Sequence, residues 1–196
     1  MLTAAVGFRV HSGWAAAVVL CGPVDAPVVV DRRKIQLVKT FTYAYRQPYH
    51  TAKEMQCPDA IKFIRGVRSD AKRLAVSFLR SLQAELGDFK IVRGALLLAS
   101  GHALPEIEKI LASHALIHTA DGELFRDSLR AACDVCGLPV EGIREKELFA
   151  AASSKTLGIQ PAALNRRILA LGKALGPPWS QDEKFAALAA WLTLVR

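Results

Sequence analysis

Residues 2–21 read LTAAVGFRVHSGWAAAVVLC, in which two apolar runs, rich in small and β-branched side chains, flank a short polar turn. The turn, His11-Ser12-Gly13, contains glycine, a residue that chain reversals favour. Two such runs around a turn are typical of a β-hairpin, so we expect strands over residues 2–10 and 14–21. Residues 28–38 follow a second turn, and their alternation indicates a third strand. The N-terminal part is therefore predicted to form three consecutive antiparallel strands.

The rest of the chain alternates between helical and extended patterns. Residues 59–86 carry an apolar side chain every three or four positions, which predicts a long amphipathic helix. Residues 90–99 are largely apolar, as buried parallel strands are. Residues 41–57 show no clear period and are expected to form an ordered loop. The other expected elements are helices over residues 105–113, 124–136, 145–153, 161–175 and 181–195, and a strand over residues 138–143.

The predicted order is β-β-β-α-β-α-β-α-α, with parallel strands joined by right-handed helical crossovers after the antiparallel ones. The 196 residues, 52% hydrophobic and 22% charged, supply enough apolar material for a core and fit a single domain over residues 1–196. No apolar run reaches the length of about 18 residues that a membrane helix needs, and no signal peptide is evident. We therefore expect a cytoplasmic protein without a membrane partner. The 26 Lys and Arg against 18 Asp and Glu give a net charge of +8, which suits phosphate-rich partners.

Cysteine and histidine spacing gives no complete metal site. Cys133 and Cys136 form one C-x-x-C, but the second pair of ligands that a zinc site needs is missing. They end the helix expected before Gly137, so we expect them to pack in the core as small apolar side chains. His114 and His118 could chelate a metal on a helix, yet their surroundings also fit a strand or loop, and no third ligand is evident. We therefore assign no metal and no resident cofactor.

The element order is that of the ribonuclease H-like fold, and four segments resemble RuvC-type Holliday-junction resolvases. Residues 6–13, VGFRVHSG, have the shape of that family's first strand and turn, Gly-Ile-Asp-Pro-Gly-Ser. Residues 137–141, GLPVE, are similar to a Leu-Pro-Val segment, residues 155–158, KTLG, to a basic, glycine-ended segment, and residues 182–189, DEKFAALA, to a final Asp-x-x-Asp-Ala-Leu-Ala helix. The resemblance implies an α/β, ribonuclease H-like fold: a mixed five-stranded sheet whose first three strands are antiparallel, with helices on both faces.

Most of the carboxylates that the resemblance implies are missing. RuvC-like nucleases gather about four carboxylates around two divalent metals, which activate a water molecule and compensate charge on the leaving oxygen. Arg9 stands in place of the first aspartate, and its guanidinium cannot ligate a metal. Residues 95–101 contain no acid, and Phe185 replaces the second aspartate of the final helix, so that Asp182 alone remains. A shared fold does not transfer function, so we expect a catalytically inactive relative.

Basic side chains are the sequence feature that favours nucleic-acid binding. Lys62, Arg65, Arg68 and Lys72 recur at spacings of three and four on the long helix. Phosphate contacts by such residues give an affinity that falls with salt and does not depend on base sequence. A solvated helix face is the simpler alternative. The residues that we expect to contact DNA or RNA are Arg9, Arg32, Arg33, Lys34, Arg65, Lys72 and Lys155.

The end of the first strand is the expected binding cleft. His11 and Ser12 follow Arg9 there, and His102 follows the fourth strand, which neighbours the first strand in this fold. Together with Asp182, these side chains would line a pocket for a phosphate group. The alternative is a solvated strand edge without a ligand.

Two other functions remain open. A metal-dependent nuclease, with Mg²⁺ as its cofactor, would need relocated ligands, for which the candidates are Asp121, Glu123, Asp127, Asp182 and Glu183. The first three also fit the start of a helix at residue 124, capped by Thr119 or Asp121, where acids favour the positive end of the helix dipole. A protein-interaction scaffold or homodimer would bind no nucleic acid and would cover an interface with aromatic side chains such as Trp14, Trp179 and Trp191.

Overall fold

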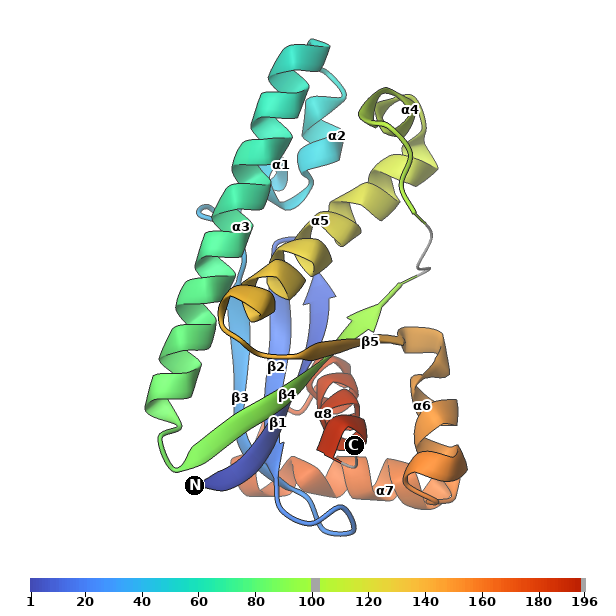
Figure 1. Ribbon diagram of the computed structural model, residues 1–196. Helices are drawn as coiled ribbons and strands as arrows, with labels where there is room; N and C mark the ends of the chain where they lie inside the picture. Colours follow the sequence, from blue (N-terminus) through green and yellow to red (C-terminus); the bar gives the residue numbers. More distant parts are fainter. Residues whose placement is uncertain (100–102, 195–196) are drawn as a thin grey trace.

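The structure, a computed structural model, describes residues 1–99 and 103–194, with the side chains of residues 154 and 155 left out. Its centre is a five-stranded sheet in the order β3-β2-β1-β4-β5 (Figure 1). β1 pairs antiparallel with β2 and parallel with β4, β2 pairs antiparallel with β3, and β4 pairs parallel with β5. The strands are β1 (Leu2–His11), β2 (Trp14–Cys21), β3 (Val28–Gln36), β4 (Phe89–Leu98) and β5 (Val140–Arg144). The predicted mixed sheet with three antiparallel strands is confirmed.

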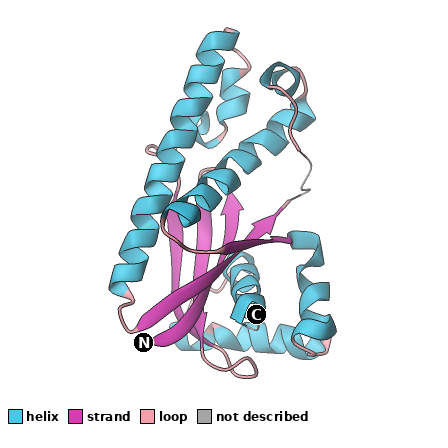
Figure 2. Ribbon diagram, in the orientation of Figure 1, coloured by secondary structure: helices cyan, strands magenta, loops and turns pink. Residues whose placement is uncertain are grey.

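Helices cover both faces of the sheet (Figures 1 and 2). The long helix α3 (Cys57–Glu85) and α5 (His114–Val135) pack together over one face, with the short α4 (Ile107–Leu111) leading into α5. On the other face, α8 (Gln181–Leu194) lies against β1, β2 and β4. α6 (Leu148–Ala151) and α7 (Pro161–Leu171) complete that layer. None of the described helices is long and apolar enough to cross a membrane.

Gly7 allows α8 to approach β1 more closely than any other residue would. A Cβ atom added at Gly7 would lie 1.9 Å from the carbonyl oxygen of Ala186 and 2.7 Å from the backbone nitrogen of Ala190. Both contacts are with backbone, so no side chain could rotate away to relieve the overlap. The glycine therefore fixes the distance between β1 and α8, and with it the position of the first turn of α8 at the end of β1.

The loop expected over residues 41–57 is wrong, because this segment contains α1 (Tyr43–Arg46) and α2 (Pro48–Ala52). Pro48 occupies the first turn of α2, where its missing N–H costs nothing. Pro48, Tyr49 and Ala52 are buried, since α2 packs against α3, α4 and α5. Helices this short show no apolar period, so their packing rather than their pattern decides the conformation.

The start of α5 also differs from the expectation. The helix begins at His114, after Ser113, whose side chain accepts a hydrogen bond from the N–H of Leu116, and not at residue 124. Asp121 and Glu123 therefore lie inside the helix, and the explanation of these acids by a helix start is wrong. The far end is close to the expectation: Cys133 is fully buried, Cys136 is only partly buried against the same core, and Gly137 follows the helix with a φ of 65°. Burial raises the pKa of the Cys133 thiol to about 12.

The C-terminal helices are more broken than expected. The single helix predicted over residues 145–153 is a 3₁₀ turn, η1 (Glu145–Glu147), followed by α6 and a π-helical turn, η2 (Ala152–Thr156). A second 3₁₀ turn, η3 (Lys173–Leu175), follows α7. β5 starts at Val140 rather than at residue 138, and β3 ends at Gln36 rather than at residue 38. The break after β5 places Glu145 at the end of the sheet, next to β1 and α8.

Candidate functional site

Arg9 is the centre of an ion-pair network at the end of β1. Its guanidinium donates two hydrogen bonds to Glu145, from Nε to Oε2 at 3.1 Å and from Nη2 to Oε1 at 2.6 Å. Nη1 donates to Oδ1 of Asp182 at 2.5 Å. The Arg9 side chain is only 16% exposed. Burial alone would lower its pKa, but the hydrogen bonds and charges of Glu145 and Asp182 outweigh burial and raise the pKa. Arg9 is therefore a permanent cation held by two carboxylates.

Three elements bring this network together. Arg9 points to the α8 side of β1, because its neighbours Phe8 and Val10 are buried in the core under α3 and α5. Asp182 is in the first turn of α8, and Glu145 directly follows β5. Phe185, one turn after Asp182, places its ring 4.8 Å from the Arg9 guanidinium, a cation–π contact that further favours the charge.

These carboxylates do not fit the magnesium ions that the resemblance implies. Both oxygens of Glu145 are bonded to Arg9, and Oδ1 of Asp182 is shared between Arg9 and Nε2 of His11, which lies 2.7 Å away. A divalent cation placed among them would be repelled by the guanidinium. Among the described residues, the end of β1 therefore holds an internal cation where the resemblance implies a metal-binding aspartate.

A row of stacked rings and cations, which we name the aromatic–basic strip, continues from His11. The strip consists of His11, Trp14, Lys34, Phe41 and Arg46. His11 and Trp14 stack with ring centroids 4.5 Å apart and an interplanar angle of 15°. The Lys34 ammonium lies 4.3 Å from the Trp14 ring and 5.7 Å from the Phe41 ring, and the Arg46 guanidinium lies 4.5 Å from the Phe41 ring.

The aromatic–basic strip is tied to the turn between β1 and β2 and is accessible at the surface. Nε of Arg46 donates to the carbonyl oxygen of Ser12 at 3.3 Å, which ties the strip to the turn between β1 and β2. Phe41 is 46% exposed and Lys34 is exposed. Rings combined with cations are the surface that stacks bases and contacts phosphates. The sequence predicted Lys34 as a nucleic-acid contact, His11 as a cleft residue and Trp14 as an interface residue, but it did not join them, because Lys34, Phe41 and Arg46 are distant from the hairpin along the chain.

Two predicted nucleic-acid contacts are engaged inside the protein. The Arg32 guanidinium donates to four carbonyl oxygens at the end of η3 and just after it: those of Leu175 at 3.4 Å, Gly176 at 2.9 Å, Pro177 at 3.1 Å, and Pro178. Arg33 pairs with Asp31 at 2.6 Å and with Glu85 of α3 at 2.7 Å. These side chains hold β3 to its neighbours.

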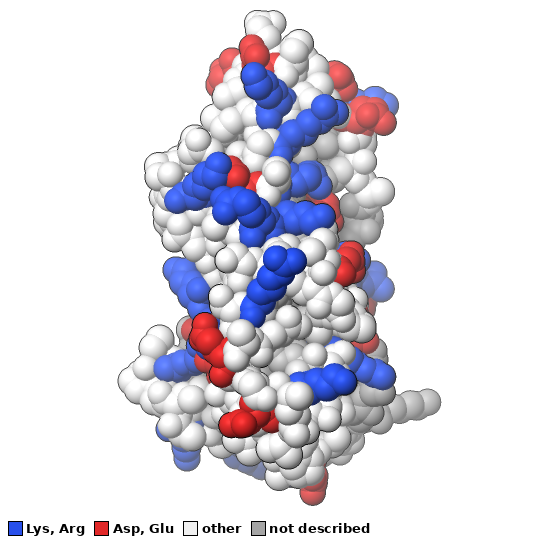
Figure 3. Space-filling model, turned by 60° about the vertical axis from the view of Figure 1, so that its left-hand side comes forward, with Lys and Arg blue, Asp and Glu red and all other residues white. Residues whose placement is uncertain are grey.

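The other predicted contacts lie on the surface or outside the described residues. Arg65 and Lys72 are exposed on α3, and Figure 3 shows basic side chains gathered over the face that α3 forms. The ion pair between Lys39 and Asp70, at 2.8 Å, joins this face to the segment after β3. His102 and the side chain of Lys155 lie outside the part of the chain that the structure describes.

The acids proposed as relocated ligands do not form one site. Glu123 pairs with Arg126 at 2.9 Å and Asp127 with Arg68 at 3.5 Å, on the face of the sheet opposite to α8. Glu183 accepts hydrogen bonds from the N–H and the hydroxyl of Ser180, as in a helix N-terminal capping box.

Asp121 is separate from these acids and is buried. It accepts a hydrogen bond from the backbone N–H of Tyr49 at 2.7 Å, and its Oδ2 lies 2.6 Å from Nδ1 of His50. Burial raises the pKa of the Asp121 carboxyl above its ordinary value, although the hydrogen bond with His50 opposes this shift. Asp121 therefore organises α2 against α5 and takes no part in the Arg9 network.

Two of the three tryptophans are used within the chain. Trp191 is fully buried, and its Nε1 donates to the carbonyl oxygen of Val24 at 2.7 Å, so the expectation that it covers an interface is wrong. Nε1 of Trp179 donates to the carbonyl oxygen of Ile168 at 2.9 Å, and its ring packs on Gly172. Of the three, Trp14 alone stands in a surface strip with basic side chains.

Comparison with known proteins extends these observations. No protein-family model and no curated protein matches the chain. Among solved structures, Thermus thermophilus RuvC in complex with a Holliday junction substrate is similar, with a TM-score of 0.52 and 11% sequence identity, over 98% of this chain and 93% of that one. A second Thermus thermophilus RuvC structure has a TM-score of 0.53 and 8% identity, over the same shares of the two chains. The chain therefore has the ribonuclease H-like fold in the form seen in RuvC, as the sequence predicted.

Proposed function

We propose that this protein is a catalytically inactive RuvC-like protein that binds structured nucleic acid, DNA or RNA, with its aromatic–basic strip and the basic face of α3. The observation that carries the proposal is the Arg9 network beside the strip. The network replaces a metal-binding group with a cation, and the strip offers rings and cations to a polyanion. A RuvC structure of the same fold was solved with a Holliday junction substrate, which supports this class of partner.

The Arg9 network supports the absence of nuclease activity. Hydrolysis of a phosphodiester by two metals needs carboxylates that are free to hold them. Here Arg9 pairs with both carboxylates, at 2.6 Å from Glu145 and 2.5 Å from Asp182, so neither is free to hold a metal. The network therefore argues against cleavage, and the affinity for nucleic acid is assigned to the aromatic–basic strip and to α3.

The aromatic–basic strip supports binding. Base stacking on an aromatic side chain contributes about 1–3 kcal/mol per base and tolerates any sequence. Trp14 and Phe41 each carry a cation over the ring, so the cations can contact phosphates, and a base stacks on a ring by displacing the cation. The link through Lys39 and Asp70 continues this surface onto α3, where Arg65 and Lys72 are exposed.

Fluorescence anisotropy of a labelled four-way junction, duplex and single strand, across a salt series and with and without Mg²⁺, tests the proposal. We expect junction-selective binding that weakens with salt, and intact strands on a gel of the same samples. The double variant Trp14→Ala/Lys34→Ala should bind at least about tenfold more weakly. Lys90→Ala is the matched control, because Lys90 is exposed at the opposite end of the sheet, beside Thr3.

Two outcomes would overturn the proposal. Magnesium-dependent cutting would show a nuclease with relocated ligands. Absence of binding at low salt, together with self-association, would favour a scaffold or homodimer.

We also propose that the protein is located in the cytoplasm, because its four cysteines are free and a reducing compartment suits free thiols.

A further inference from the structure

A cluster of three histidines joins α2 to the first turns of α5. His50 is on α2, and His114 and His118 are on α5. The ring centroids of His50 and His118 lie 4.4 Å apart, as do those of His114 and His118, and those of His50 and His114 lie 5.4 Å apart. Each residue offers one nitrogen, and all three nitrogens lie within 4.8 Å of one another.

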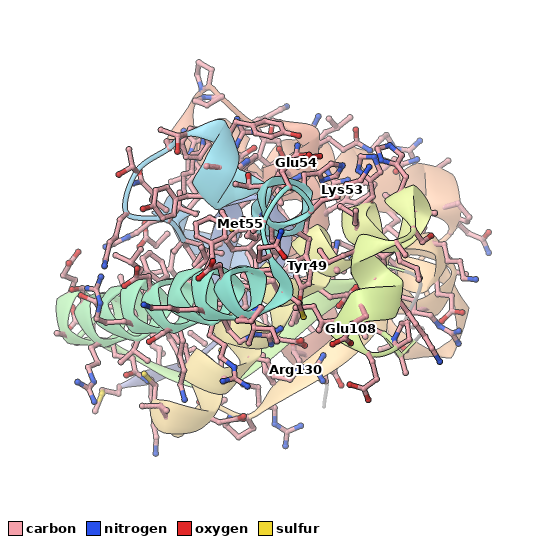
Figure 4. All side chains as sticks on the ribbon, turned by 90° about the horizontal axis from the view of Figure 1, so that it is seen from above. Tyr49, Lys53, Glu54, Met55, Glu108 and Arg130 are labelled. Atoms are coloured by element: carbon pink, nitrogen blue, oxygen red, sulfur yellow. The ribbon has the colours of Figure 1, made fainter. Side chains whose placement is uncertain are left out.

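The position of α2 makes this cluster possible. α2 contacts α3, α4 and α5, and Figure 4, which looks down on this end of the molecule, shows Tyr49 of α2 at the centre of these helices. Tyr49 is buried, and its backbone N–H donates to Asp121 of α5. The residue after Tyr49 is His50, so the buried contact sets the place of the histidine beside α5. The cluster lies on the α3 and α5 side of the sheet, opposite to the face that α8 covers.

Asp121 fixes the orientation of the His50 ring. Oδ2 of Asp121 lies 2.6 Å from Nδ1 of His50, and Asp121 is only 2% exposed. A carboxylate accepts and cannot donate, so Nδ1 of His50 carries the proton and Nε2 of the neutral ring keeps its lone pair. A carboxylate behind a histidine in this way is the arrangement that orients metal-ligating histidines in proteins and increases their basicity.

The two histidines of α5 have the spacing of a chelating pair. Residues four apart lie on one face of a helix, and the Nε2 atoms of His114 and His118 are 3.0 Å apart. Tetrahedral zinc with bonds of about 2.0–2.1 Å holds its ligand nitrogens about 3.3 Å apart. Both rings are exposed, so they can rotate by the small amount needed to close around an ion together with His50.

We propose that His50, His114 and His118 bind a zinc ion, with Asp121 as the residue that orients His50. Imidazole nitrogens suit zinc and related transition metals, whereas magnesium and calcium prefer oxygen ligands. The fourth position faces solvent, since two of the three ligands are exposed, and is filled by water. The ion links α2 to α5 and so fastens the segment between β3 and α3 onto the helical layer. The site is independent of the proposed nucleic-acid function.

Zinc binding by the full chain, prepared without a histidine tag and freed of metal with a chelator, tests this site. After dialysis against buffered Zn²⁺, atomic emission should show about one zinc ion per chain, and Co²⁺ should give the strong visible absorption of a tetrahedral complex. His118→Ala and His114→Ala should lose the bound zinc and the cobalt spectrum. His11→Ala is the matched control, because it removes a histidine at the Arg9 network and should keep both signals.

Asp121→Asn is the sharper variant. In this variant the backbone N–H of Tyr49 still needs an acceptor, so the side-chain oxygen of the asparagine stays next to Tyr49. Its NH₂ group then faces Nδ1 of His50 and donates to it. The ring proton then moves to Nε2 and blocks the metal-binding lone pair, so we expect zinc affinity to fall about 10- to 100-fold. Circular dichroism establishes that each variant is folded. Equal zinc binding by the wild type and His118→Ala, or no zinc at micromolar concentration, would overturn the proposal and leave a hydrogen-bonded histidine cluster.

Discussion

The Arg9 network and the histidine cluster each contain an aspartate bonded to a histidine, yet they differ in what they leave free for a ligand. Asp182 shares one oxygen between Arg9 and His11, and Glu145 gives both oxygens to Arg9. Asp121 bonds to only one side of His50 and leaves the other nitrogen to a ligand. The first arrangement satisfies its charges internally, whereas the second leaves three ligand nitrogens close together.

The difference teaches that whether a carboxylate serves a metal site depends on the side chain that it is bonded to. A carboxylate next to a guanidinium neutralises it and stops being a metal ligand. A carboxylate behind an imidazole makes the imidazole a better ligand. The end of β1 thus offers no free metal ligand, while a position that the resemblance does not mark is suited to a metal ion.

The largest effect should come from moving α8 away from the Arg9 network. In Gly7→Ala, the new Cβ overlaps the backbone of Ala186 at 1.9 Å, so the helix has to shift and the free energy of unfolding should fall by about 3 kcal/mol. Urea denaturation measures this loss. Zinc binding should persist in the folded fraction, because the histidine cluster is on the other face of the sheet.

Gly66→Ala provides the control for that substitution. A Cβ at Gly66, within α3, meets nothing within 4 Å, and alanine favours a helix interior over glycine by about 0.5–1 kcal/mol. This variant should therefore be slightly more stable than the wild type. Equal stability of Gly7→Ala and the wild type would contradict the close contact between β1 and α8.

The next effect concerns the charge of Arg9. Arg9→Asp places three carboxylates together, and we expect it to lower the free energy of unfolding by about 2–3 kcal/mol, less than for a fully buried pair because Glu145 is partly exposed. Millimolar Mg²⁺ should then stabilise the variant by about 1.4 kcal/mol at ten times its Kd. Thermal melting with and without Mg²⁺ measures this recovery.

Arg9→Met separates two effects of Arg9→Asp: the loss of the ion pairs with Glu145 and Asp182, and the gain of a carboxylate that can bind Mg²⁺. It removes the cation without adding a carboxylate, so it should be destabilised but should gain little from Mg²⁺. If the wild type were stabilised by Mg²⁺ as strongly as Arg9→Asp, the two regions would not differ in the way that we describe, and the guanidinium would not act as the internal cation.

Much of the fold could be predicted from the sequence, because its signals are local. The hairpin over residues 2–21 and the apolar period over residues 59–86 each occupy a continuous segment, and the structure has β1, β2 and α3 at these places. α1 and α2 were missed because four or five residues carry no period. Their conformation depends on packing against α3 and α5, which a local pattern does not contain.

The sites depend on contacts between distant segments, and this is why the prediction was incomplete. Arg9, His11 and Asp182 were expected in one cleft from the resemblance, and the structure joins them. Glu145 was missed because it is 136 residues from Arg9 and was expected to start an ordinary helix. The histidine cluster was missed for two reasons: His50 lay in the supposed loop, and the helix that carries His114 and His118 was expected to start only at residue 124.

Single substitutions in the aromatic–basic strip should have a smaller effect, on nucleic-acid affinity and its salt dependence, which substitutions in the histidine cluster should not have. Lys34→Ala should reduce the slope of log affinity against log salt by about 1, the amount expected for one phosphate contact. Trp14→Ala should weaken binding about tenfold with little change in slope, since stacking on a ring releases no counterions. Anisotropy titrations at several salt concentrations separate the two outcomes. His118→Ala should bind nucleic acid like the wild type, and a loss there would make the two regions one surface.

The smallest effect concerns the cysteines and decides between two sets of zinc ligands. At pH 8, iodoacetamide should modify the exposed Cys57, whereas Cys133 should react only after unfolding, because it is fully buried and burial raises the pKa of its thiol to about 12. The nucleophile is the thiolate, and a rise in pKa from 9.0 to about 12 makes the thiolate about a thousandfold rarer. Mass spectrometry of the native and urea-unfolded protein measures the modified sites.

Alkylation of the native protein should leave zinc binding unchanged if the histidines hold the ion. Protection of the partly exposed Cys136 by zinc in the native protein, with loss of the ion once Cys136 is alkylated, would instead assign the ion to the C-x-x-C pair.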